Sequence, residues 1–388
     1  MIKASNTAKL LAALALLLGF GAEVAGAQEG AQEGATEGAP DVAARAWVLT
    51  DVRSGEYLAG ENASARLPMA STTKIMVALV ALQEVDLEEE VTVSEEAAAF
   101  ARPPYSNVGL VAGDVLSARE LLMATMIASG DDAAYALAEH LGDGSAQRFV
   151  EEMNRKTEPL GLDDTRFENP VGLDARDQYS SARDLARMTH LAMGYPEFRE
   201  MVSTTYATIS TQDREIELVS TNDLLFTYPP ATGVKTGTTP RAGPSLVASA
   251  AAENEAYVSV VLDSREDRFA ASIRALEHGF ATYDREELVR GGERYATVEK
   301  PYRRGETVEL AAKESVDGLV DGDSDVAREV RVFEDPPGSA EAGAKLGEIV
   351  VRVDGERVGE SPLVARRGYD AASLWERVWY TVQGVWKE

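Results

Sequence analysis

The spacing of apolar residues divides the chain into a helical region with regions of strands before and after it. From Ser71 to about Tyr195 the pattern is mostly that of α-helices, and the apolar run after Lys74 predicts a buried helix. A hairpin precedes this region, and further strands follow it. The strands expected from these short β-like runs are 46–50, 56–59, 204–209, 233–238, 245–251 and 257–262.

Strands, then helices, then strands again predict an α+β fold, in which helices pack against one sheet. The short loops between residues 233 and 262 indicate antiparallel neighbours. A helix from Arg265 to Tyr283, with one apolar face, ends this region. We therefore expect an α+β domain with an antiparallel sheet over residues 44–288.

A second region begins near Glu293, where short β-like runs alternate with Gly, Pro and Asp turns. Residues 293–368 are therefore expected to form a small all-β domain. Asp354-Gly355 has the sequence of a tight hairpin turn within it. Nothing in this region suggests catalytic chemistry, so we interpret it as a spacer or interaction module.

Residues 371–388 form the last expected element, an amphipathic helix. Its apolar positions follow i, i+3, i+4 spacing, and Trp is favoured where a helix lies in a membrane surface. The alternative is a terminal helix that packs on the all-β domain. The apolar residues are Leu374, Trp375, Val378, Trp379, Val382, Val385 and Trp386.

The first 27 residues have the pattern of a signal peptide. Lys3 and Lys9 precede an apolar stretch over 10–20 that is short for a membrane span. The small residues at 25–27 predict cleavage after Ala27, with an uncleaved anchor as the alternative. Residues 28–43 have the composition of a flexible linker. The mature chain is therefore expected in the cell envelope, at the outer face of the cytoplasmic membrane, or outside the cell.

Composition excludes several classes of function. A formal net charge of −27 argues against nucleic acid as a partner, because phosphate binding needs basic patches. We interpret the acidic surface as a solubilising one. The chain has no cysteine, which excludes disulfides and thiol catalysis. His140, His190 and His278 lie too far apart in sequence to suggest a metal site, and no metal is expected.

The first candidate for chemistry is the pair Ser71 and Lys74. Residues three apart on a helix share a face, so the lysine amine can reach the serine hydroxyl. Serine needs a neighbouring base to act as a nucleophile, and a buried lysine can serve because burial lowers its pKa. Ser-x-x-Lys alone is a weak signal, since it occurs by chance in many chains.

Two further motifs follow in the order found in penicillin-binding proteins and class A β-lactamases. They are Ser129-Gly130-Asp131 and Lys235-Thr236-Gly237-Thr238. With these motifs and the segments 129–134, 167–174, 179–186 and 233–237, the chain resembles the low-molecular-mass D-alanyl-D-alanine carboxypeptidases. The resemblance runs from about Ala44 to the C-terminus. It implies the serine β-lactamase/transpeptidase fold for residues 44–288.

The resemblance also implies an activity and a role for each motif residue. The substrate would be a peptidoglycan pentapeptide, β-lactams would be covalent inhibitors, and no cofactor would be needed. The C-terminal helix would hold the protein at the membrane surface. In this scheme Ser71 is the nucleophile, Lys74 its base and Ser129 a proton relay, and the oxyanion is bound by backbone N–H groups of Ser71 and Thr238. The substrate-binding residues would be Lys235, Asp131, Thr236 and Thr238.

Two positions depart from the family pattern. Asp131 replaces an asparagine, and an ionised carboxylate cannot donate a hydrogen bond to a substrate carbonyl; it could pair with Lys74 or with Lys235. Val171 follows Asn-Pro where many relatives have histidine. Two alternatives to the carboxypeptidase are a β-lactamase and a catalytically weak peptidoglycan-binding protein. The β-lactamase is disfavoured because no asparagine has the glutamate four residues before it that class A enzymes use.

Overall fold

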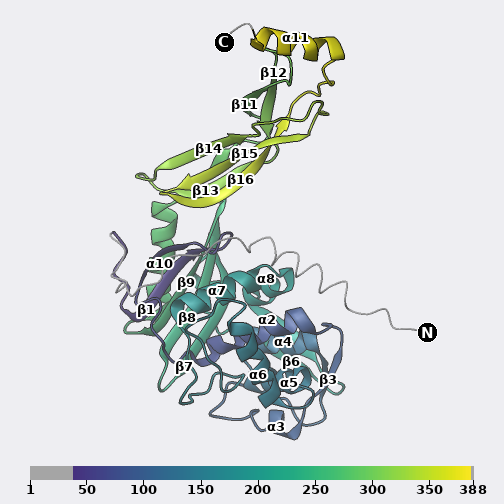
Figure 1. Cartoon of the computed structure of the whole chain (residues 1–388). Helices are drawn as coiled ribbons and strands as arrows, with labels where there is room; N and C mark the ends of the chain where they lie inside the picture. Colours follow the sequence, from purple (N-terminus) through teal and green to yellow (C-terminus); the bar gives the residue numbers. More distant parts are fainter. Residues whose placement is uncertain (1–37, 386–388) are drawn as a thin grey trace, which may run out of the picture. The chain divides into compact units, whose positions relative to one another are not determined.

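The computed structural model describes residues 38–385, and the expected signal peptide lies outside them. Its central element is a five-stranded antiparallel sheet with the order β2-β1-β9-β8-β7 (Figure 1). The meander from β7 to β9 agrees with the sequence prediction. The strands are β1 Ala44–Asp51, β2 Tyr57–Glu61, β7 Ala231–Thr239, β8 Gly243–Ala252 and β9 Glu255–Ser264. The mixed helix-and-sheet fold confirms the predicted fold class.

The expected helical region contains most of the helices and one short hairpin, and a second short hairpin follows it. The strands β3, β4 and β6 were not predicted, since β3 and β4 have only three residues each and show no periodicity. The helices are the 3₁₀ turn η1 Ala70–Thr73, α2 Lys74–Glu84, α3 Glu95–Ala98, α4 Ala118–Met126, α5 Asp131–Leu141, α6 Ala146–Thr157, α7 Ala182–Met193, α8 Pro196–Ser203, α9 Leu224–Thr227 and α10 Arg268–Thr282. The hairpins pair β3 Glu90–Thr92 with β4 Val115–Ser117, and β5 Tyr206–Ser210 with β6 Glu215–Val219.

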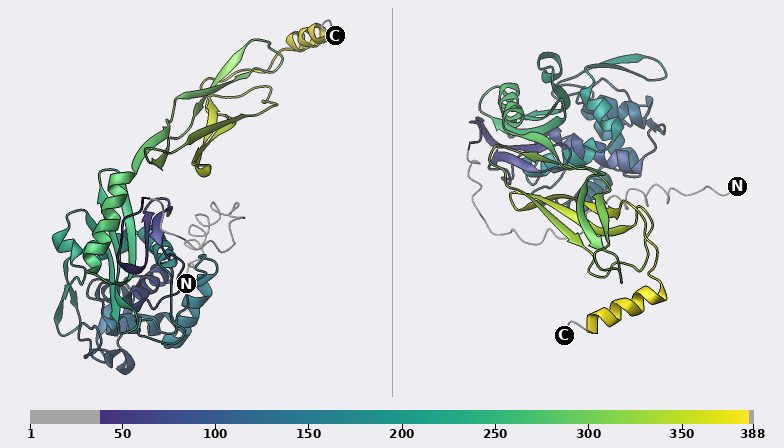
Figure 2. Two further views of the ribbon diagram at one scale, coloured as in Figure 1. Left: turned by 90° about the vertical axis from the view of Figure 1, so that its left-hand side faces the viewer. Right: turned by 90° about the horizontal axis from the view of Figure 1, so that it is seen from above.

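The central sheet is apolar on both faces because alternate residues of a strand point to opposite sides. In β1, Ala46 and Val48 join the core under the helices, whereas Trp47 and Leu49 join a second core. The second core lies against α10, which packs on β1, β8 and β9 (Figure 2). It also includes Val42, and Ala39 packs against it, so packing begins before the expected domain start at Ala44.

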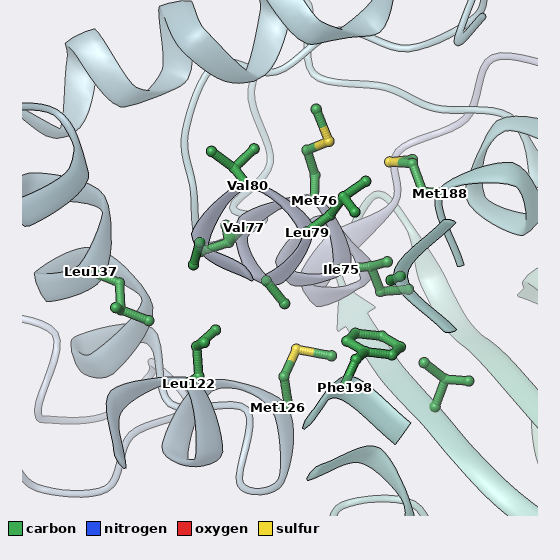
Figure 3. Close-up of a cluster of buried hydrophobic side chains, with 14 of the residues drawn as sticks. Ile75, Met76, Val77, Leu79, Val80, Leu122, Met126, Leu137, Met188 and Phe198 are labelled. Carbon is green, nitrogen blue, oxygen red and sulfur yellow. The ribbon is translucent and has the colours of Figure 1, made fainter. Parts of the chain in front are cut away.

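Helix α2 lies at the centre of the larger core and carries the candidate lysine at its first residue. Its apolar residues are buried on every side (Figure 3). Side chains from α4, α5, α7 and α8 surround it, including Leu122, Leu137, Met188 and Phe198. A helix buried all round has a fixed axis, because close-packed interiors resist shifts of their elements. The position of Lys74 is therefore set by the core.

The region after α10 is built of strands around its own apolar core. One sheet has the order β11-β12-β16-β15-β14, and β10 pairs with β13. Strand β10 was not predicted, because its charged sequence hides the strand pattern. The strands are β10 Asp284–Val289, β11 Arg294–Glu299, β12 Thr307–Ala312, β13 Val316–Val320, β14 Val326–Val332, β15 Lys345–Val353 and β16 Glu356–Ala365.

The C-terminal helix α11, Leu374–Val385, has one side against the turn between β11 and β12. Arg303 Nε lies 3.1 Å from Glu376 Oε1, and the rings of Tyr302 and Tyr380 meet edge to face. The apolar side remains exposed, with Leu374, Trp375, Val378, Trp379 and Val382 on it. No helix among residues 38–385 has the length and apolar content to cross a membrane.

A buried ion pair joins the first strand of the central sheet to β10. Arg285 Nη2 lies 2.6 Å from Asp51 Oδ1, and the two side chains are 8% and 0% exposed. Breaking a buried pair leaves an uncompensated charge. Arg285→Met should therefore lower the free energy of unfolding by about 3 kcal/mol, measured by urea denaturation. Arg290→Met, which breaks an exposed pair with Glu287, is the control and should leave stability unchanged. Equal stability of the two variants would contradict this prediction.

Candidate active site

Ser71 and Lys74 meet at the start of the central helix. Ser71 lies in the 3₁₀ turn η1, and Lys74 is the first residue of α2. Residues i and i+3 of a 3₁₀ turn lie one above the other. Lys74 Nζ accordingly donates a hydrogen bond to Ser71 Oγ at 3.0 Å, the contact expected from the sequence. The lysine side chain has no exposed surface.

The same ammonium group has two further partners. Lys74 Nζ lies 2.5 Å from Asp131 Oδ1 and 3.1 Å from the carbonyl oxygen of Val171. Of the two pairings considered for Asp131, the structure therefore shows the one with Lys74. Burial lowers the pKa of Lys74 below its ordinary value, while the carboxylates of Asp131 and Asp132 act in the opposite direction.

The loop 168–173 brings the Val171 carbonyl to Lys74. Asn169 Oδ1 accepts the backbone N–H groups of Gly172 and Leu173, at 2.8 and 2.9 Å. Gly172 has φ +90°, and a Cβ at this position would lie 2.1 Å from the carbonyl oxygen of Ala70. Only glycine permits this approach. The loop thus packs its backbone directly against the turn that carries Ser71.

Strand β7 approaches Ser71 from another direction. A Cβ on Gly237 would lie 3.1 Å from Met69 O and 3.2 Å from Ser71 N, so the glycine allows the strand to lie close to Ser71. Lys235 is 1% exposed on the same strand. Burial places the pKa of Lys235 well below its ordinary value, and the charge of Lys74 lowers it further. Because β7 packs against η1, Lys235 lies in the same region as Ser71 and Lys74.

Ser129 lies on the turn before α5, two residues from Asp131, and is 4% exposed. Its φ is +61°, and Ala70, next to the nucleophile, has φ +49°. Non-glycine residues in the left-handed region cost about 1–3 kcal/mol and are concentrated at functional sites. The backbone is therefore strained at both of these serine-bearing turns.

The two threonines of the third motif, Thr236 and Thr238, form hydrogen bonds with different side chains. Thr236 Oγ1 lies 2.7 Å from Thr221 Oγ1. Thr238 Oγ1 accepts a hydrogen bond from Arg268 Nη1 at 2.7 Å, and the same nitrogen donates to Gly237 O at 3.0 Å. Arg268 thus brings a third positive charge to the site.

The sequence motifs missed Arg268, Thr221 and Asp132. Arg268 is the first residue of α10 and belongs to no motif; only the pairing of β7 with β8 and β9 brings it near Thr238. Among residues 38–385 there is no group of histidine, aspartate and glutamate side chains that could hold a metal ion.

A serine in contact with a buried lysine, beside a second buried lysine on an adjacent strand, defines a class of protein. It is the class of serine acyl-transfer enzymes with the penicillin-recognising fold. Comparison with known proteins identifies the family. The model of peptidase family S11, D-alanyl-D-alanine carboxypeptidase, matches residues 33–266.

Curated relatives match over most of their length. D-alanyl-D-alanine carboxypeptidase DacF of Bacillus subtilis is 32% identical over 343 residues, which are 85% of this chain and 87% of the relative. DacC of Escherichia coli is 32% identical over 357 residues, 88% of each chain. The chain belongs to the D-alanyl-D-alanine carboxypeptidase family, and it is a serine peptidase of peptidoglycan metabolism.

Solved structures agree with this assignment. Penicillin-binding protein 5 of Haemophilus influenzae has a TM-score of 0.69 at 29% identity, over 85% of this chain and 99% of the other. The DD-transpeptidase of Streptomyces K15 has a TM-score of 0.59 at 34% identity, over 63% of this chain and 99% of the other.

Replacing Asp131 tests its electrostatic effect on Lys74. A base must be neutral to accept a proton, so the acylation rate should rise as pH increases through the pKa of Lys74. Asp131 raises that pKa. Asp131→Asn should therefore move the acidic limb of the rate profile to lower pH, with activity retained or increased because the family's amide donor is restored.

The measurement is the rate of acylation by a fluorescent penicillin across pH. Asp164→Asn serves as a control, because Asp164 pairs with Arg66 at a more exposed site. A large loss of activity in Asp131→Asn, with the acidic limb unchanged, would contradict this role of Asp131.

Proposed function

We propose that the chain removes the terminal D-alanine from peptidoglycan pentapeptides through an acyl-enzyme on Ser71. The observation that carries the proposal is the 3.0 Å contact between a fully buried lysine amine and the Ser71 hydroxyl. Burial favours the neutral amine, which can take the hydroxyl proton as the serine attacks. Lys74 is the proposed base.

In the proposed reaction, Ser71 Oγ attacks the carbonyl carbon of the penultimate D-alanine, and its proton passes to Lys74 Nζ. The backbone N–H groups of Ser71 and Thr238 stabilise the oxyanion. The C–N bond then breaks, and a proton reaches the leaving D-alanine nitrogen through Ser129. Water hydrolyses the ester and restores the serine. A β-lactam would form the same ester through opening of its ring.

Four side chains in or beside the third motif are proposed to bind the substrate carboxylate. Lys235 and Arg268 supply positive charge from neighbouring elements, and charge-assisted hydrogen bonds are the strong ones in such sites. Thr236 and Thr238 add hydroxyl groups, and both are connected to other side chains that fix their rotamers. Asp131 is proposed to act on Lys74, because its carboxylate is held there at 2.5 Å.

Ser71→Ala should abolish release of D-alanine from a pentapeptide and should abolish labelling by fluorescent penicillin. The fold should be unchanged, since Ser71 is not part of the apolar core. Ser203→Ala, at an exposed serine on α8, is the matched control and should keep full activity. D-alanine release by Ser71→Ala at the wild-type rate would rule out the mechanism. Rapid loss of the penicillin adduct from the wild-type protein would instead favour a β-lactamase.

The proposal extends to location: the chain is exported and held at the membrane surface by α11. The polar side of the helix packs on the β11–β12 turn. Its apolar side is exposed: Trp375 is 83% exposed and Trp379 is 65% exposed. An exposed apolar face with two tryptophans is suited to a membrane surface. The proposal thus combines the two alternatives considered from the sequence, a helix that packs on the all-β domain and a helix that lies in a membrane surface.

Deletion of residues 372–388 should abolish sedimentation with lipid vesicles and leave activity on soluble peptide unchanged. Interfacial binding scales with buried apolar area, so detergent should release the full-length protein whereas high salt should not. Trp375→Ala with Trp379→Ala, which removes only the apolar contacts, should weaken sedimentation in the same way. If full-length and truncated proteins both stay in the supernatant, the anchor is disproved.

A further inference from the structure

Asp132 is a buried carboxylate at the active site that belongs to none of the proposed catalytic steps. It is 0% exposed and follows Asp131 on the first turn of α5. Its oxygens accept the backbone N–H groups of three consecutive residues: Val108 at 3.1 Å, Gly109 at 3.0 Å and Leu110 at 3.1 Å. The loop 106–110 is thus folded around one carboxylate.

The same loop contacts the neighbouring catalytic-site residue. The carbonyl oxygen of Ser106 accepts the backbone N–H of Asp131 at 2.7 Å. This N–H lies in the first turn of α5, where backbone donors have no partner within the helix. Asp131 in turn lies 2.5 Å from Lys74 Nζ. A continuous series of contacts therefore leads from Asp132 through the loop to the base.

The local sequence fits this arrangement. Burial raises the pKa of the Asp132 carboxyl, and the backbone N–H groups of the loop oppose that rise. A Cβ on Gly130 would lie 2.9 Å from Asp132 Oδ1, so glycine leaves room for the carboxylate. The two adjacent carboxylates thus bind different partners. Asp131 contacts the ammonium group of Lys74, and Asp132 accepts hydrogen bonds from backbone N–H groups of the loop 106–110.

A second group holds the loop from its other side. Arg214, at the start of the β5–β6 hairpin's second strand, donates to Gly109 O at 2.7 Å and to Asp114 Oδ2 at 2.9 Å. Arg214 is 36% exposed, whereas Asp132 is fully buried. The loop is therefore fixed from both sides, and Asp132 supplies the buried attachment.

We propose that Asp132 is a positioning residue: its carboxylate fixes the loop 106–110, and the loop, through the Ser106 carbonyl, places Asp131 on Lys74. The inference rests on the proposed function, because its readout is acylation of Ser71. Asp132 touches neither the nucleophile nor the base in this scheme. Its main effect on the reaction passes through Asp131, and its charge has a smaller direct effect on the pKa of Lys74.

The charged groups around Lys74 determine the sign of the effect. The carboxylates of Asp131 and Asp132 both raise the pKa of Lys74, whereas the charges of Lys74 and Arg268 both lower the pKa of Lys235. Weakening the Asp131–Lys74 contact removes a partner of the charged amine. The neutral base then forms at lower pH, so loss of the Asp132 attachment should shift the acidic limb in the same direction as loss of the Asp131 charge.

The experiment is a double-mutant cycle on the full chain with Asp132→Asn, Asp131→Asn and both together. Acylation by fluorescent penicillin is measured across pH. Asp132→Asn should shift the acidic limb of the acylation rate to lower pH, because it weakens the contact between Asp131 and Lys74. In the Asp131→Asn background, Asp132→Asn should cause a smaller further shift of the limb, because only the direct effect of its charge on Lys74 remains.

A limb that does not move in Asp132→Asn, or that moves equally in both backgrounds, would overturn the proposal. Asp184→Asn is the matched control: Asp184 is 4% exposed and accepts the Asp164 N–H, but it lies on α7. Asp184→Asn should lower the free energy of unfolding without shifting the acidic limb of the acylation rate profile. Arg214→Gln loosens the same loop at a partly exposed site, which keeps the test available if Asp132→Asn does not fold, and it should cause a smaller shift in the same direction.

Failure of the proposed function has a different outcome. A wild-type protein that forms no penicillin adduct would disprove the acyl-enzyme on Ser71. Normal wild-type acylation with no pH shift in Asp132→Asn would disprove only the positioning role.

Discussion

The ammonium group of Lys74 has no exposed surface and is held between the Ser71 hydroxyl, the Asp131 carboxylate and the Val171 carbonyl. Burying a cation is costly unless hydrogen bonds and an opposite charge compensate. The surrounding structure supplies that compensation from a turn, a helix start and a loop that are distant in sequence. The opposing effects of burial and of Asp131 set how readily the amine becomes a neutral base.

Two backbone segments, the loop 168–173 and strand β7, must approach Ser71 closely for this arrangement to exist. Gly172 and Gly237 make this possible, because a Cβ at either position would press on the turn that carries Ser71. Helix α2, buried on all sides, fixes that turn relative to the core. Strain at Ala70 and Ser129 shows that the surrounding packing overrides local backbone preference at these turns.

Local features of this site were predictable from the sequence, whereas long-range ones were not. The contact of Lys74 with Ser71 follows from a spacing of three residues, and the meander β7–β9 follows from its short loops. The partner of Asp131 stayed ambiguous because both lysines are distant in sequence. Arg268 and Asp132 were missed, since their contacts depend on how strands and loops pack. Strand β10 was missed because its charged residues obscure the alternation of a strand.

The most direct measurement is the location of the covalent adduct. The full-length protein is treated with a penicillin, digested, and its peptides are sequenced by tandem mass spectrometry. The mass of the opened β-lactam should appear on Ser71, because this hydroxyl lies 3.0 Å from the buried Lys74 amine. An adduct on Ser129, or on no serine at all, would contradict the assignment of Ser71 as nucleophile and Lys74 as its base.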